Sequence, residues 1–106
     1  MEIKIFWTDF AKNELHKIFI FYRENASLKV ARGLVLGITH EVLKLENEPN
    51  IGQKEGLLIE REQVYRYLIY RKYKLIYWFN IETNRIEIMD VFDTRQNPSK
   101  IKRMTR

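Results

Sequence analysis

The chain has 106 residues, of which 45% are hydrophobic and 31% are charged, and it contains no cysteine. This length and composition predict a single globular domain over residues 1–106 and argue against a disordered or fibrous protein. The lack of cysteine excludes disulfides, thiolate metal sites and cysteine nucleophiles. Because no apolar run is long enough to span a bilayer, we expect a cytoplasmic protein without a membrane partner.

The formal net charge of +5 is unevenly distributed along the chain. Residues 1–50 contain seven basic and seven acidic side chains, and residues 51–94 again contain seven of each. The excess therefore lies in a basic C-terminal tail, residues 95–106, which has five Lys or Arg side chains and no acid. Such a tail suits phosphates or an acidic protein segment. A solvated, frayed terminus has the same composition, so charge alone does not decide between these interpretations.

The N-terminal half predicts one strand followed by a helix. Apolar Ile3, Ile5 and Trp7 recur at every second position, with polar Glu2 and Lys4 between the first of them, which is typical of a short half-buried strand. Thr8 is then placed to cap a helix, and Asp9 puts a negative charge at the positive end of the helix dipole. Apolar side chains recur at helical spacing up to about residue 24.

A second helix is predicted over residues 28–48. Ser27 is placed to cap it, and Pro49 stops the helical pattern. The connection between the two helices is short, so we expect an antiparallel helical hairpin. Gly33 and Gly37 offer a smooth groove on the second helix for close approach within this hairpin.

The C-terminal half predicts a β-meander. Residues 49–63 show no period and are interpreted as a long connection with a short strand at 57–59. The following segments are dense in β-branched and aromatic residues: 64–71, 73–79 and 85–92. The predicted fold class is therefore α+β, with an N-terminal strand and an antiparallel helical hairpin packed on an antiparallel β-sheet of three to four strands.

Aromatic side chains on these predicted strands could stack on nucleic-acid bases. The candidates are Tyr65, Tyr67, Tyr70, Tyr73, Tyr77 and Trp78. If only one face of the sheet is buried, about half of these side chains should be core residues.

Four short motifs, taken in order, resemble one family of proteins. They are Pro49-x-x-Gly52, Tyr65-Arg66, Tyr73-Lys74-Leu75-Ile76-Tyr77 and Ile86-x-Ile88-x-x-Val91-Phe92-x-x-Arg95-x-x-Pro98. Their order after a helical hairpin resembles the RelE/ParE superfamily of toxins from bacterial type II toxin–antitoxin systems, and the resemblance covers essentially the whole chain. It implies a growth-inhibiting toxin that a cognate antitoxin silences with an extended, acidic, partly disordered segment.

The resemblance implies two alternative activities, because members of the superfamily either cleave messenger RNA on the ribosome or poison DNA gyrase. In the RNA-cleaving branch, basic side chains bind the scissile phosphate and stabilise its developing charge. The matching positions here are Arg66, Lys74 and Arg95. Asp93 is the nearest group for proton transfer, although it is also placed to form a structural ion pair with Arg95. No tyrosine or histidine follows Arg95.

The long second helix and the ending Phe92-Asp93-x-Arg95-x-x-Pro98 look closer to the ParE branch. That branch implies an inhibitor of DNA gyrase without an enzymatic site of its own. A ribosome-dependent endoribonuclease is the alternative, and a non-toxic domain that binds nucleic acid or protein is the third. We expect no cofactor. We also expect no metal, because His40-Glu41-Val42-Leu43-Lys44 has lysine where a zinc-binding helix needs its second histidine.

Overall fold

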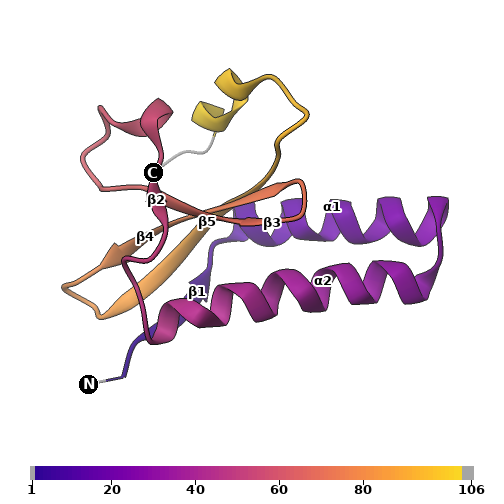
Figure 1. Ribbon diagram of the computed structural model, residues 1–106, viewed down its shortest axis with the longest axis horizontal. Helices are drawn as coiled ribbons and strands as arrows, with labels where there is room; N and C mark the ends of the chain where they lie inside the picture. Colours follow the sequence, from indigo (N-terminus) through magenta and orange to yellow (C-terminus); the bar gives the residue numbers. More distant parts are fainter. Residues whose placement is uncertain (1, 104–106) are drawn as a thin grey trace.

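A helical hairpin covers one face of a five-stranded sheet, and two short 3-10 helices cover part of the other face (Figure 1). The computed structural model describes residues 2–103. The elements follow in the order β1 Lys4–Trp7, α1 Asp9–Asn25, α2 Leu28–Leu43, η1 Lys44–Glu46, β2 Gln53–Lys54, η2 Gly56–Leu58, β3 Arg66–Tyr70, β4 Tyr73–Asn80, β5 Arg85–Asp93 and η3 Pro98–Arg103. The predicted α+β order of strand, helical hairpin and β-meander is confirmed.

Side-chain caps fix the starts of both long helices, as the sequence predicted. The hydroxyl of Thr8 accepts a hydrogen bond from the backbone N–H of Ala11 at 3.2 Å. The hydroxyl of Ser27 accepts one from the backbone N–H of Val30 at 3.1 Å. Each bond satisfies a donor that the first helical turn leaves without an intrahelical partner. At its C-terminal end, α2 tightens into η1 and stops before Pro49.

The sheet differs from the prediction in strand number and direction. It has five strands in the order β1-β5-β4-β3-β2, and β1 runs parallel to β5 with Lys4 opposite Arg85. The meander of β3, β4 and β5 is antiparallel, as expected. Because β4 pairs with one edge of β5, β1 satisfies the backbone groups of the other edge. The sheet is therefore mixed rather than purely antiparallel.

The connection between α2 and β3 also differs from the prediction. Its short strand, β2, lies at Gln53–Lys54, and residues 57–59 belong to the turn around η2 instead. Leu58 is buried there, whereas Leu57 and Ile59 are exposed. A strand would give the same alternation of burial, but the backbone here forms a 3-10 turn, which places Leu58 in the core.

Both faces of the sheet are buried, whereas the sequence pattern had suggested one. The face toward α1 and α2 carries the larger cluster, which includes Leu75, Tyr77, Ile86 and Ile88. The second cluster lies on the opposite face and contains Leu58, Tyr65, Ile76, Met89, Phe92 and Ile101. The turns η2 and η3 supply Leu58 and Ile101 to this face, which explains why nearly all of β5 is buried.

The first part of the basic C-terminal tail packs onto the domain. Ile101 is buried, and the guanidinium of Arg103 lies 2.9 Å from Oδ1 of Asp90 and 3.1 Å from Oε1 of Glu14. We call the group of Arg103, Asp90 and Glu14 the C-terminal clasp. Arg106, also part of the predicted tail, lies outside the described residues. None of the helices within residues 2–103 is long and apolar enough to cross a membrane.

Candidate functional site

Arg66 lies at the start of β3 and holds the loop that precedes β2. Its Nη1 donates a hydrogen bond to the carbonyl of Gly52 at 2.9 Å. The Tyr77 hydroxyl accepts from the backbone N–H of Gly52 at 3.0 Å and donates to the carbonyl of Pro49 at 2.9 Å. Burial raises the pKa of Tyr77, so its hydroxyl keeps the proton that it donates. The Pro49-x-x-Gly52 motif is therefore a structural junction at this end of the sheet.

Lys74 lies on β4 and forms an ion pair with Glu55. The distance from Nζ to Oε1 of Glu55 is 2.7 Å, and Nζ lies 4.3 Å from the centre of the Tyr67 ring. Because side chains alternate along a strand, Lys74 points away from the face that carries Leu75 against the helices. The Glu55 side chain is only 4% exposed, so the carboxylate depends on this lysine for charge compensation.

Arg95 follows β5 and pairs with Asp93, as the local spacing had suggested. Nη2 of Arg95 lies 2.7 Å from Oδ2, and Nε lies 3.1 Å from Oδ1. The backbone N–H of Arg95 also donates to Oδ1 at 2.9 Å. The hydrogen bond from the Arg95 side chain lowers the pKa of Asp93. A carboxylate with a lowered pKa is a weak base, so this pair suits fixing the strand end better than proton abstraction.

The structure brings Asp93 to Arg95, but it does not bring the three predicted cations to one point. Arg66 and Lys74 project from opposite faces of the sheet. Arg95 lines a separate groove beside α1, next to Tyr22 and Tyr73. In the part of the chain that is described, no contact partner is shared by Arg66, Lys74 and Arg95.

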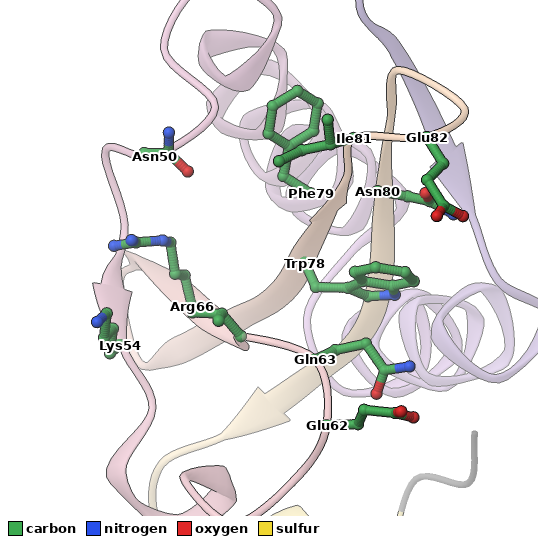
Figure 2. A pocket seen from close by; sticks show the side chains of 11 residues that line it. Asn50, Lys54, Glu62, Gln63, Arg66, Trp78, Phe79, Asn80, Ile81 and Glu82 are labelled. Atoms are coloured by element: carbon green, nitrogen blue, oxygen red, sulfur yellow. The ribbon is translucent and has the colours of Figure 1, made fainter.

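A hollow with charged side chains in its wall lies at the edge of the sheet beside Arg66. Its volume is about 520 Å³, and we call it the edge hollow. It is lined by Asn50, Lys54, Glu62, Gln63, Val64, Arg66, Trp78, Phe79, Asn80, Ile81 and Glu82. Figure 2 shows Lys54 and Arg66 on one side, with Trp78 between them and the carboxylates of Glu62 and Glu82. The sequence motifs indicated Arg66 but not Lys54, because the pairing of the two-residue strand β2 has no local signal.

Three of the six aromatic candidates of the meander are buried, but they lie on both faces of the sheet rather than on the single buried face that the prediction assumed. Tyr65, Tyr73 and Tyr77 are buried core residues. The other three are only partly buried: Tyr67, Tyr70 and Trp78. Trp78 is the one that lines the edge hollow.

A second concavity, which we call the hairpin groove, lies between α2 and the β3–β4 turn. Its volume is about 580 Å³, and its lining residues are Tyr22, Val30, Gly33, Leu34, Tyr70, Arg71, Lys72 and Tyr73. Two cations and no carboxylate line it. The ammonium of Lys72 lies 5.2 Å from the centre of the Tyr22 ring, and a hydrogen bond from Lys72 lowers the pKa of Tyr22.

Two residues of the hairpin groove are locally unfavourable. Gly33 lies inside α2, where a Cβ would meet nothing within 4 Å, so packing does not require glycine there. Glycine in a helix interior costs about 1 kcal/mol relative to alanine. Arg71 has a φ of 54°, which is uncommon for a residue with a side chain. Gly37, by contrast, is explained, because a Cβ there would collide with the Tyr70 hydroxyl.

The chain matches the family model described as ParE toxin of type II toxin-antitoxin system, parDE, over residues 5–98. The chain belongs to the ParE toxin family. It is therefore the toxin component of a type II toxin–antitoxin system, and its partner is a cognate antitoxin.

Comparison with solved structures supports the same fold for this ParE-family toxin. A structure described as the chromosomal ParDE TA system from P. aeruginosa superposes with a TM-score of 0.70 at 20% sequence identity. The match covers 86% of this chain and 95% of that chain. No curated protein matches the sequence. Within residues 2–103, no group of three or more His, Asp or Glu side chains could hold a metal ion.

Proposed function

We propose that this toxin stops growth by binding DNA gyrase and holding it on cleaved DNA, rather than by cleaving RNA. The observation that carries the proposal is the separation of the three matching cations. Lys74 and Arg95 are each paired with a carboxylate, and Arg66 is bound to a loop carbonyl. RNA cleavage needs donors that converge on one phosphate to stabilise its developing negative charge. An inhibitor that acts by contact has no such requirement.

Proton transfer at the end of β5 is also poorly supported. A general base works best when its pKa lies near the working pH. The ion pair with Arg95 lowers the pKa of Asp93, and burial raises the pKa of Tyr73 beside it. At neutral pH the first group is therefore a weak base and the second stays protonated. This argues for a binding inhibitor over the endoribonuclease.

The antitoxin, in this proposal, inserts an acidic amphipathic segment into the hairpin groove. The groove has apolar and aromatic walls and carries Arg71 and Lys72 with no carboxylate among its lining residues. Carboxylates of the antitoxin would complement these two cations. Because Gly33 has no side chain, the backbone of the antitoxin segment can approach α2 closely. Antitoxin binding would therefore explain a glycine that destabilises the helix.

Inducible expression in a gyrase-susceptible bacterium tests the proposed target. We expect DNA double-strand breaks and an SOS response before any cleavage of messenger RNA, and both should disappear when the cognate antitoxin is co-expressed. Three charge variants separate gyrase inhibition from RNA cleavage further, because each would abolish an endoribonuclease activity. They are Arg66→Gln, Lys74→Gln and Arg95→Gln. Messenger RNA cleavage that appears before DNA breaks, and that is lost in these variants, would overturn the proposal.

A further inference from the structure

The edge hollow contains a pair of like charges that the fold itself does not explain. Lys54 on β2 and Arg66 on β3 are register partners, so their side chains lie opposite each other on the same face. Like charges in this arrangement destabilise a sheet. Among the ion pairs of residues 2–103, Lys74, Arg85 and Arg95 each have a carboxylate, but neither Lys54 nor Arg66 does. An anion placed between the two cations would remove their repulsion.

The hollow exists because β3 is shorter than β4. Pairing of β3 with β4 ends at Arg66 opposite Tyr77, whereas β4 continues to Asn80 and pairs there only with β5. The outer edge of β4 beyond Tyr77 therefore has no strand beside it in the described sheet. Trp78 lies in this stretch and lines the hollow. The two cations and Trp78 therefore line the same open edge of the sheet, the cations from the face that carries Tyr77 and Trp78 from the opposite face.

The polar groups of the hollow are arranged with opposite charges on opposite sides. Figure 2 shows the Lys54 and Arg66 side chains on one side of Trp78 and the Glu62 and Glu82 carboxylates on the other. A purely anionic ligand would meet the carboxylates unfavourably. A ligand with a phosphate at one end and hydroxyl or amino donors at the other matches both sides. A flat ring in the middle would stack on the indole.

We propose that the edge hollow binds a nucleotide, with its phosphate between Lys54 and Arg66 and its base on Trp78. Sugar hydroxyls or an exocyclic amino group would donate hydrogen bonds to Glu62 on the far side. The hollow volume of about 520 Å³ lies in the range of ordinary small-molecule sites. Two sources share this chemistry: a free mononucleotide, and an exposed nucleotide at the broken or frayed end of a strand. The inference does not depend on gyrase being the target.

Fluorescence titration tests this site directly, since Trp7 and Trp78 are the two tryptophans of the chain. In a Trp7→Phe background, emission reports on Trp78 alone. The ligands are inorganic phosphate, thymidine monophosphate, a single-stranded thymine decamer and a blunt duplex of the same length. We expect saturable quenching by the monophosphate, the decamer or both, and none by inorganic phosphate. Saturation by the monophosphate identifies a free nucleotide as a sufficient ligand, and saturation by the decamer but by neither the monophosphate nor the duplex identifies an exposed nucleotide of an unpaired strand.

Charge variants show whether the quenching arises at the proposed site. Lys54→Gln should weaken binding at least tenfold, and Arg66→Gln should do the same. Lys54→Gln is the more specific test, because Lys54 is exposed, whereas Arg66 also donates a hydrogen bond to the Gly52 carbonyl. The matched controls Lys29→Gln and Arg32→Gln remove exposed cations on α2 and should leave binding unchanged. Absence of saturable quenching by either nucleotide ligand, or equal weakening by Lys29→Gln and Lys54→Gln, would overturn the proposal.

Discussion

The C-terminal clasp provides the sharpest stability prediction. The Asp90 side chain is fully buried, and Arg103 donates to its two carboxylate oxygens at 2.9 and 3.3 Å. Removing one partner of a buried ion pair costs about 3–5 kcal/mol, because the other charge stays buried without compensation. The Arg103 side chain is 26% exposed, so solvent already screens part of the interaction. We therefore expect Arg103→Gln to lower the free energy of unfolding by about 2 kcal/mol.

The loss should depend on pH in a direction set by Asp90. Burial raises the pKa of Asp90 in the folded protein, and the hydrogen bond from Arg103 opposes that rise. Without Arg103, the folded-state pKa of Asp90 rises further. A carboxyl with a raised folded-state pKa favours the fold when protonated and loses that contribution as pH increases through the folded-state value. The difference between wild type and Arg103→Gln should therefore be small near pH 3 and largest at neutral pH.

Urea denaturation at several pH values measures these differences. Asp90→Asn in the Arg103→Gln background should recover part of the lost free energy, because it removes the uncompensated charge. Arg61→Gln is the matched control, since Arg61 is a less buried arginine that donates to the Lys102 carbonyl at 3.2 Å. It should change stability by less than about 0.5 kcal/mol. An Arg103→Gln loss that is equally small, or that does not change with pH, would show that Arg103 does not compensate the buried charge of Asp90.

Substitutions at Gly52, Gly33 and Lys74 test the junction, the hairpin groove and the ion pair of Lys74 with Glu55. Gly52→Ala should destabilise by about 1–3 kcal/mol, because its Cβ would lie 2.7 Å from a backbone oxygen, whereas Gly56→Ala, with open space, should be nearly neutral in the same urea assay. Gly33→Ala should stabilise the free toxin by about 0.5–1 kcal/mol, because it removes a glycine from a helix interior. Gly33→Leu should weaken antitoxin binding at least tenfold in calorimetry. Unchanged affinity would show that the hairpin groove is not part of the antitoxin interface. Lys74→Gln should destabilise by about 1–3 kcal/mol, because Glu55 stays buried without its cation, and Lys74→Gln with Glu55→Gln should recover part of this loss in thermal unfolding.

Local sequence patterns predicted those parts of the fold that depend on near neighbours. Caps at Thr8 and Ser27 and the helical spacing of apolar residues located both helices, since these signals act within a few positions. The parallel pairing of Lys4 with Arg85 joins segments far apart in the sequence. No local pattern encodes such a contact, so the mixed sheet could not be predicted in the same way.

The candidate site shows the same division between local and distant contacts. The Asp93–Arg95 pair was predicted because the two residues are neighbours at the end of one strand. The partners of Arg66 and Lys74 lie in the irregular connection before β3 and were not predicted. The charge pair of Lys54 and Arg66 depends on the register of β2, a strand too short to show any alternation.

A cleavage assay with purified gyrase shows whether this ParE-family toxin acts by holding gyrase on cleaved DNA, as we propose. Supercoiled plasmid is incubated with gyrase, ATP and the toxin, and the products are released with detergent and protease. The proposal predicts toxin-dependent linear DNA and loss of supercoiling, both suppressed by the antitoxin. Unchanged gyrase products, together with cleavage of messenger RNA on translating ribosomes by the same preparation, would contradict it.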